Sequence, residues 1–261
     1  MILLVDIGNT RVKWAMQSAG HTSPQRAAEH ARWSADDWQR ELFDGLPVAR
    51  VLAATVAGAD SRRALETAAR LAGTTRVEFV TSTAAMAGVR NAYPEPGLLG
   101  VDRWVAVIGA FHLAHGACCV VDVGTAATLD TVDASGQHLG GFIVPGPQMM
   151  VRSLYAGTSN LAAHTAASPV GGLELFADNT RDAIERGCRV ALAALIDRTY
   201  AELVRRTQAT PRLYCTGGAV DEVLPYVLAP HERVPDLVLR GLAHIAEALP
   251  ERRPAAAVQP R

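Results

Sequence analysis

Lysine is almost missing from this chain of 261 residues: Lys13 is the only one, and arginine supplies the other basic side chains. The formal net charge is −1, and no run of basic residues is interleaved with aromatics. Since a protein needs a positive surface to hold a phosphate backbone, these absences argue against a nucleic-acid partner. They also single out Lys13 as a residue to follow.

Long apolar runs are missing as well. The longest ones are short and broken by Asp, Gly or Arg, so none approaches the roughly 20 apolar residues that a membrane helix needs. Met1 leads directly into Ile2–Asp6 without a basic n-region or a small-residue cleavage site. We therefore expect a cytoplasmic protein without a membrane partner.

Two common motif classes are absent. The four cysteines show no Cys-x-x-Cys spacing, and three lie in or beside apolar, strand-like runs, where a free thiol packs as a small hydrophobe. There is no Gly-x-x-x-x-Gly-Lys-Ser/Thr, and no Gly-x-Gly-x-x-Gly opens a helix after a strand. This excludes a P-loop, so a nucleotide site must be of another type.

One short pattern is present twice. The apolar run Ile2–Val5 leads into Asp6-Ile7-Gly8-Asn9-Thr10, and Cys118–Val121 leads into Asp122-Val123-Gly124-Thr125. Each is followed by an alternating stretch, which predicts a hairpin. Glycine lets the backbone approach phosphates, while Asn, Thr and N–H groups donate hydrogen bonds. One Asp-Gly pair at a strand end is equally well a simple turn, but two copies point to phosphate binding.

The remaining pattern also suggests two similar halves. Short strands are expected at 51–55 and 213–216, and helices at 61–71, 103–115 and 181–206. Asn179 or Thr180 is a suitable N-cap for the last helix. We predict an α/β protein with these limits: an N-terminal lobe over 1–115, a C-terminal lobe over 116–250, and a disordered tail over 251–261. Residues 155–175 lack periodicity and are interpreted as either a lid or a subunit contact.

The paired hairpins resemble the phosphate motifs of the acetate and sugar kinase, chaperone ATPase and actin superfamily. This resemblance implies two duplicated actin-like (ribonuclease H-like) lobes, with mixed sheets flanked by helices and an active site in the cleft between them. Chaperone ATPases and actins carry large inserted subdomains, for which 261 residues leave no room.

A longer series of motifs resembles the type III pantothenate kinases, also known as Bvg accessory factors. The matching motifs, in order, are Asp6-x-Gly8-Asn9-Thr10-x-x-Lys13, Tyr93, Gly100-x-Asp102-Arg103, Asp122-x-Gly124-Thr125, Gly140-Gly141-x-Ile143-x-Pro145-Gly146, Asn179-Thr180 and Thr216-Gly217-Gly218. Each string is weak alone, but their joint order and spacing from residue 6 to residue 218 are specific.

The resemblance implies a role for each matching position. Asp102 is the expected catalytic base, and Asp122 is the expected ligand of a monovalent cation, K⁺ or NH₄⁺. The residues expected at ATP, which brings Mg²⁺, are Asp6, Ile7, Gly8, Asn9, Thr10, Arg11, Val12, Lys13 and Thr125. The residues expected at pantothenate are Tyr93, Gly100, Val101, Asp102, Arg103 and Thr180, with Arg103 pairing its carboxylate and Thr180 reaching the site from the partner subunit of a homodimer.

Each of these side chains also has a purely structural interpretation. Asp102 would cap a helix that begins near Arg103, and Arg103 would be a surface arginine. Tyr93 before a proline is often a loop anchor, Thr180 is a possible helix cap, and Lys13 on a strand often points to solvent.

The function implied is ATP-dependent phosphorylation of pantothenate to 4′-phosphopantothenate, the first step of coenzyme A biosynthesis. The alternatives are a kinase of another small alcohol on the same fold and a non-catalytic or secondary regulatory protein. A regulator would be expected to lose some of Asp6, Asp102, Asp122 and Thr125, and all four are present.

Overall fold

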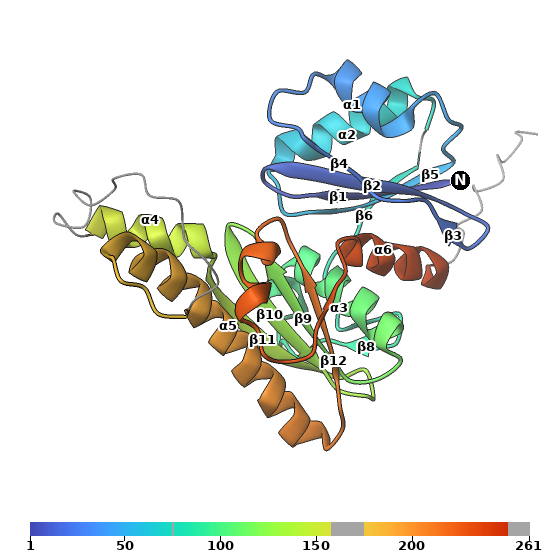
Figure 1. Ribbon diagram of the computed structural model, residues 1–261. Helices are drawn as coiled ribbons and strands as arrows, with labels where there is room; N and C mark the ends of the chain where they lie inside the picture. Colours follow the sequence, from blue (N-terminus) through green and yellow to red (C-terminus); the bar gives the residue numbers. More distant parts are fainter. Residues whose placement is uncertain (75, 158–174, 250–261) are drawn as a thin grey trace, which may run out of the picture.

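The computed structural model describes residues 1–74, 76–157 and 175–249. Its elements are stacked in layers (Figure 1): two helices, a sheet, a second pair of helices, a second sheet, and a long helix on the far side. The tail expected over 251–261 and most of the segment 155–175 lie outside the described residues.

The first sheet is built around β1 (Ile2–Ile7). This strand pairs antiparallel with β2 (Arg11–Ser18) and parallel with β5 (Arg50–Thr55). Its side chains are buried on both faces from Leu3 onward, as expected for a strand covered by helices on both sides. The sheet is completed by β3 (His21–Thr22), β4 (Arg26–Glu29) and β6 (Val77–Phe79).

The second sheet repeats this plan around β9 (Cys118–Val123). This strand pairs antiparallel with β10 (Ala126–Val132) and parallel with β12 (Arg212–Thr216). The sheet order is β11-β10-β9-β12-β13, with β11 at His138–Pro145 and β13 at Glu232–Arg233. The duplication expected from the sequence is therefore present as two sheets of the same core topology.

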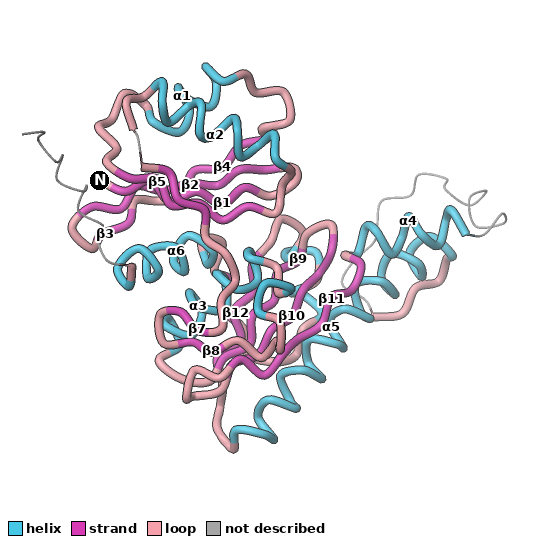
Figure 2. Tube along the Cα trace, turned by 180° about the vertical axis from the view of Figure 1, so that it is seen from behind, coloured by secondary structure: helices cyan, strands magenta, loops and turns pink. Residues whose placement is uncertain are grey.

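Helices cover the outer faces of both sheets (Figure 2). On the first sheet, α1 (Ala35–Phe43) and α2 (Ala59–Leu71) bury one hydrophobic cluster with β1 and β5. On the second, α5 (Thr180–Thr207) buries another cluster with β9 and β12, and α4 (Pro147–Gly157) packs beside α5. The shorter elements are β7 (Ala85–Met86), β8 (Val89–Arg90) and the 3₁₀ turns Pro96–Leu98, Val220–Glu222 and Leu224–Tyr226.

Two helices fill the space between the sheets. Helix α3 (Val101–Ala114) packs on β9 and β10, while α6 (Leu237–Ala248) packs on β1, β2 and β5. The two helices cross closely, because a Cβ on Gly109 would overlap the Leu237 carbonyl and one on Gly241 would overlap the Val105 carbonyl. One hydrophobic cluster runs through this layer from Leu4 to Tyr214, so the helix pair fixes the two sheets relative to each other.

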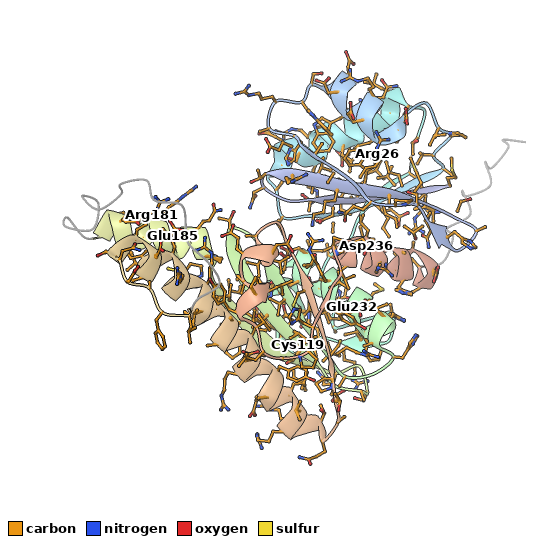
Figure 3. All side chains as sticks on the ribbon, viewed as in Figure 1. Arg26, Cys119, Arg181, Glu185, Glu232 and Asp236 are labelled. Atoms are coloured by element: carbon orange, nitrogen blue, oxygen red, sulfur yellow. The ribbon has the colours of Figure 1, made fainter. Side chains whose placement is uncertain are left out.

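The expected helices and strands are present with modest changes at their ends. Helix α3 begins at Val101 rather than near Arg103, and α5 begins at Thr180 with the Asn179 side chain as its N-cap. All four cysteines are buried and free, as expected; Cys119 is labelled within the second sheet in Figure 3. In the part of the chain that is described, no helix is long and apolar enough to cross a membrane.

Candidate active site

The two Asp-x-Gly turns occupy equivalent places in the two sheets. Asp6 on β1 lies opposite Lys13 on β2, and Asp122 on β9 lies opposite Thr128 on β10. In each turn a glycine N–H closes the hairpin: Gly8 donates to the Arg11 carbonyl at 3.0 Å, and Gly124 donates to the Ala126 carbonyl at 2.9 Å.

A cavity of about 250 Å³ lies where these two turns meet the start of α3. Both turns, α3, β9 and β10 contribute side chains to it. The lining residues are Gly8, Asn9, Thr10, Val56, Asp102, Arg103, Ala106, Val120, Asp122, Gly124, Thr125, Ala126, Thr128 and Asp130. The structure therefore brings together residues that the sequence places more than 100 positions apart.

Asp6 and Asp122 are both unusually basic carboxylates. Burial raises the pKa of Asp6 to about 7; Lys13 lowers it, and the neighbouring carboxylates of Asp122 and Asp102 raise it. Burial also raises the pKa of Asp122, with Lys13 again acting in the opposite direction and Asp102 in the same one. Three carboxylates and the chain's only lysine therefore share one electrostatic environment.

This arrangement suits cations. Within residues 1–74, 76–157 and 175–249, no group of three His, Cys, Asp or Glu side chains could hold a metal ion. Crowded, buried carboxylates are nevertheless stabilised by added positive charge, and hard cations prefer oxygen ligands. The donor set of Asp6 and Asp122 therefore fits a cation that arrives with phosphate oxygens.

Asp102 lies in the first turn of α3, beside the cavity. The residue in the N-cap position is Gly100, so Asp102 does not have the capping position that was its alternative interpretation. One carboxylate oxygen, Oδ1, accepts a hydrogen bond from the Arg103 backbone N–H at 2.8 Å. The Asp102 side chain lines the cavity, and its second oxygen accepts no hydrogen bond from the residues that the structure describes.

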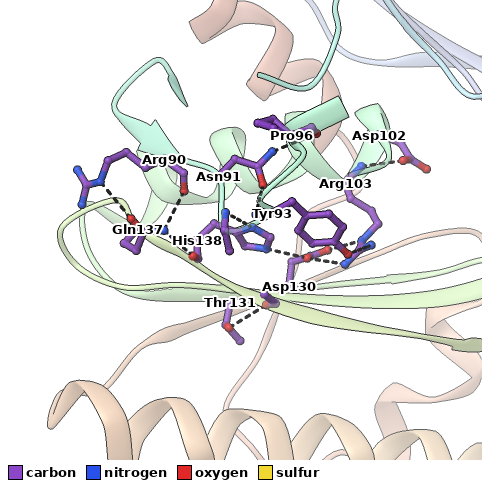
Figure 4. Close-up of polar contacts among 12 residues, drawn as sticks. Arg90, Asn91, Tyr93, Pro96, Asp102, Arg103, Asp130, Thr131, Gln137 and His138 are labelled. Carbon is purple, nitrogen blue, oxygen red and sulfur yellow. Dashed lines mark hydrogen bonds and ion pairs between the residues drawn. The ribbon is translucent and has the colours of Figure 1, made fainter. Parts of the chain in front are cut away.

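Arg103 makes a buried bidentate ion pair that the sequence analysis did not anticipate (Figure 4). Its Nε donates to Asp130 Oδ2 and its Nη2 to Asp130 Oδ1, both at 2.8 Å. Its Nη1 donates to the Tyr93 hydroxyl at 3.3 Å. His138 Nε2 lies 2.9 Å from Asp130 Oδ1. Asp130 thus occupies the edge of the guanidinium formed by Nε and Nη2.

Two glycines outside the two turns allow other parts of the backbone to pack closely against the Asp122 turn. Gly217, after β12, has a φ of +100°, and a Cβ there would overlap the Val123 carbonyl and press on Asp122 Oδ1. A Cβ on Gly146 would overlap the Gly124 carbonyl. These positions belong to the Gly-rich motifs of the sequence, which here hold the Asp122 turn against its neighbours.

Other expected site residues have different positions. Tyr93 is half-buried beside Arg103, and Val101 and Gly100 begin α3. Thr180 is exposed at the start of α5 and does not line the cavity of its own chain. In Figure 3, Arg181 and Glu185 mark this end of α5, which projects with α4 away from the sheets.

Sequence reasoning missed three side chains that support the site. Asp130 and His138 are two, and the third is His30, whose Nε2 lies 2.9 Å from the Gly8 carbonyl in the first turn. Asp130 had a signal, because it is a charged residue within the alternating stretch that follows the second Asp-x-Gly turn. Nothing in the sequence indicates a partner for His30 or His138.

Comparisons with known proteins show the family of this chain. A family model described as type III pantothenate kinase matches residues 2–202. A type III pantothenate kinase from Azoarcus sp. (strain BH72) is 41% identical over 253 residues, which cover 95% of this chain and 91% of that protein.

Two solved structures are similar in fold. One, from Campylobacter jejuni, is titled a Baf family transcriptional activator; its TM-score is 0.55 at 21% identity, covering 94% of this chain and 97% of that one. The other, a 2-dehydro-3-deoxygalactonokinase protein from Sinorhizobium meliloti, has a TM-score of 0.57 at 15% identity and covers 95% of this chain and 99% of that one. At these identities the likeness shows the fold alone, which is the expected actin-like one.

Proposed function

Because the chain belongs to the type III pantothenate kinase family, which phosphorylates pantothenate in coenzyme A biosynthesis, we propose that the cavity between the two Asp-x-Gly turns is its active site. The observation that carries this proposal is the meeting of both Asp-x-Gly turns with Asp102 and Arg103 around one cavity. In this proposal the N-terminal lobe spans residues 1–115 and the C-terminal lobe residues 116–250.

The two turns bind the phosphates of ATP. The exposed Asn9 and Thr10 of the first turn and Thr125 of the second offer side-chain donors at the cavity, and the glycines allow close approach of backbone N–H groups. Lys13 lowers the pKa of both Asp6 and Asp122, so its positive charge acts on the carboxylates of both turns. The phosphate-binding segment is Asp6, Ile7, Gly8, Asn9, Thr10, Arg11, Val12 and Lys13, together with Thr125.

Asp102 is the catalytic base. Phosphoryl transfer to an alcohol requires a group that accepts the hydroxyl proton within hydrogen-bond reach. Asp102 lines the cavity between the turns, and among the described residues it is Oδ1 alone that accepts a hydrogen bond, from the backbone of Arg103. The other oxygen accepts the proton from the primary hydroxyl of pantothenate, which lies beside Tyr93, Gly100, Val101 and Arg103.

Cations complete the charge balance. Asp122 would hold a monovalent cation, K⁺ or NH₄⁺, and Asp6 would contact the Mg²⁺ of Mg-ATP through water. When bound, these cations offset the negative charge of the carboxylates and of the transferring phosphate. The raised pKa values of Asp6 and Asp122 show that their ionised forms are disfavoured when no cation is bound. A bound cation would stabilise these ionised carboxylates, which supports the assignment.

The active form is a homodimer. Large apolar side chains are exposed on α4 and in the segment just before α5, with Met149 at 43%, Leu175 at 57% and Phe176 at 85% exposure, which is typical of an interaction surface. Thr180 lies at this end of α5, outside its own cavity, and in the dimer it reaches the pantothenate site of the partner subunit.

Release of ADP by the purified protein tests the proposal. The protein is incubated with Mg-ATP with and without pantothenate, in potassium buffer and in sodium buffer. Turnover that requires pantothenate and falls in sodium supports both the substrate and the cation at Asp122. Turnover without pantothenate would contradict the proposed substrate. Equal rates in both salts would contradict the monovalent cation at Asp122.

A further inference from the structure

Four side chains beside the cavity form one buried network: Tyr93 from the loop before α3, Arg103 from α3, Asp130 from β10 and His138 from β11 (Figure 4). Arg103 is 6% exposed, Asp130 2% and His138 0%. Charged groups are this deeply buried only when they are paired. The network is therefore a built feature of the fold.

His138 connects the pair to the loop. Its Nδ1 lies 3.4 Å from the Ala92 backbone nitrogen, which can only donate, and its Nε2 lies 2.9 Å from Asp130 Oδ1. This pattern selects the neutral tautomer in which Nε2–H donates to Asp130. The His138 ring also stacks on Tyr93, with centroids 6.3 Å apart and planes inclined by 15°.

Asp130 is fully engaged by these contacts. Its Oδ2 accepts from Arg103 Nε, and its Oδ1 accepts from both Arg103 Nη2 and His138. The Arg103 charge is therefore balanced inside the protein, and the guanidinium cannot rotate without breaking two short bonds. What remains for a ligand is one N–H of Nη1, whose other N–H donates to the Tyr93 hydroxyl, and the second N–H of Nη2. Arg103 and Asp130 both line the cavity.

We propose that Asp130 and His138 are positioning residues of the pantothenate site, which hold Arg103 so that its remaining N–H groups donate to an uncharged oxygen of pantothenate rather than to its carboxylate. A guanidinium already neutralised by a bidentate carboxylate gains little from a second one, whereas its directed N–H group suits a hydroxyl or amide oxygen. This inference rests on the proposed function, in which Arg103 contacts pantothenate.

The test measures kcat and KM for each substrate separately in the full-length enzyme. His138→Phe keeps a ring beside Tyr93 but removes both nitrogen contacts, whereas His138→Gln places an amide N–H near the position of Nε2. Arg103→Lys removes the fork itself. Thr131→Val is the matched control, because Thr131 is the next residue on β10 and its hydroxyl donates away from the network, to the Gly140 carbonyl at 3.1 Å. Thermal unfolding of each variant reports whether it is folded.

We expect His138→Phe to raise the KM for pantothenate about tenfold while the KM for ATP changes less than about twofold, since a small misplacement of a binding group is costly. His138→Gln should recover most of the loss, and Thr131→Val should match the wild type. If Arg103→Lys raises the KM for pantothenate but His138→Phe does not, the positioning role is overturned and the proposed function stands. Equal increases in the KM values for pantothenate and ATP in His138→Phe would also overturn the positioning role, because they would indicate a disturbance of the whole active site.

A substrate analogue tests the part of the inference that concerns the oxygen. In this analogue the pantothenate carboxylate is replaced by a neutral primary amide. If Arg103 meets an uncharged oxygen, Arg103→Lys lowers kcat/KM for pantothenate and for the analogue by the same factor. A loss confined to pantothenate would place Arg103 at the carboxylate and overturn the inference. A wild-type enzyme that turns over ATP without needing pantothenate would instead refute the proposed function.

Discussion

Replacing Asp6 with asparagine is expected to make the protein more stable at neutral and alkaline pH. Burial, together with the nearby Asp122 and Asp102 carboxylates, raises the pKa of Asp6 from its ordinary 3.8 to about 7. The folded protein therefore keeps a proton on Asp6 that the unfolded chain releases above pH 3.8. Wild-type stability is lost as the pH rises from about 4 to 7, whereas an asparagine does not titrate.

The size of the effect follows from the shift. A rise from 3.8 to about 7 corresponds to about 4 kcal/mol at roughly 1.4 kcal/mol per pH unit. Between pH 5 and pH 8 the variant should therefore gain about 3 kcal/mol on the wild type. The gain in stability is accompanied by a loss of function, because the same variant should bind Mg-ATP more weakly.

Urea unfolding followed by circular dichroism, without nucleotide, measures the difference at pH 5 and pH 8. Asp36→Asn is the control, since Asp36 is an exposed acidic residue in the first turn of α1, and its substitution should have a similar small effect at both pH values. A stability difference between Asp6→Asn and wild type that does not change with pH would refute the assignment of a buried, proton-binding Asp6.

Three further substitutions test how the site is held. Gly217→Ala should lower stability by about 1–3 kcal/mol and weaken potassium activation, because the new Cβ presses on Asp122; unchanged potassium dependence would argue against that contact. Gly241→Ala should cost about 1–3 kcal/mol in urea unfolding, since it forces α6 away from α3, and a neutral result would mean that the helices separate freely. His30→Ala should raise the KM for ATP about fivefold by freeing the Gly8 carbonyl, with the KM for pantothenate as the internal control.

The sequence was sufficient to predict the fold because its signals are local and repeated. The run Val5-Asp6-Ile7-Gly8 and the run Val121-Asp122-Val123-Gly124 each specify an apolar strand and a turn within a few residues. Each turn also determines which strands pair, because a tight turn places the strand before it antiparallel to the strand after it; β1 and β2 pair in this way, with Asp6 opposite Lys13. The halves therefore predict two similar sheets, and the structure confirms them.

The network beside the cavity could not be predicted in the same way. Arg103 and Asp130 are 27 residues apart and meet only because α3 packs on β10. The Arg103 guanidinium was expected to pair with a ligand, and no local sequence pattern reveals that Asp130 on β10 accepts hydrogen bonds from its Nε and Nη2. The position of α6 beneath the first sheet is likewise a result of helix packing at Gly241, which periodicity alone does not show.

The catalytic role of Asp102 is tested most directly by a single-turnover measurement on Asp102→Asn. Enzyme in excess over labelled ATP is mixed with saturating pantothenate and Mg²⁺, and the transfer of phosphate is followed by rapid quench. The account predicts a rate of transfer about 10²–10⁴ times lower than that of the wild type, with ATP affinity nearly unchanged. A variant that transfers phosphate at the wild-type rate would show that another group accepts the proton, and would contradict the account.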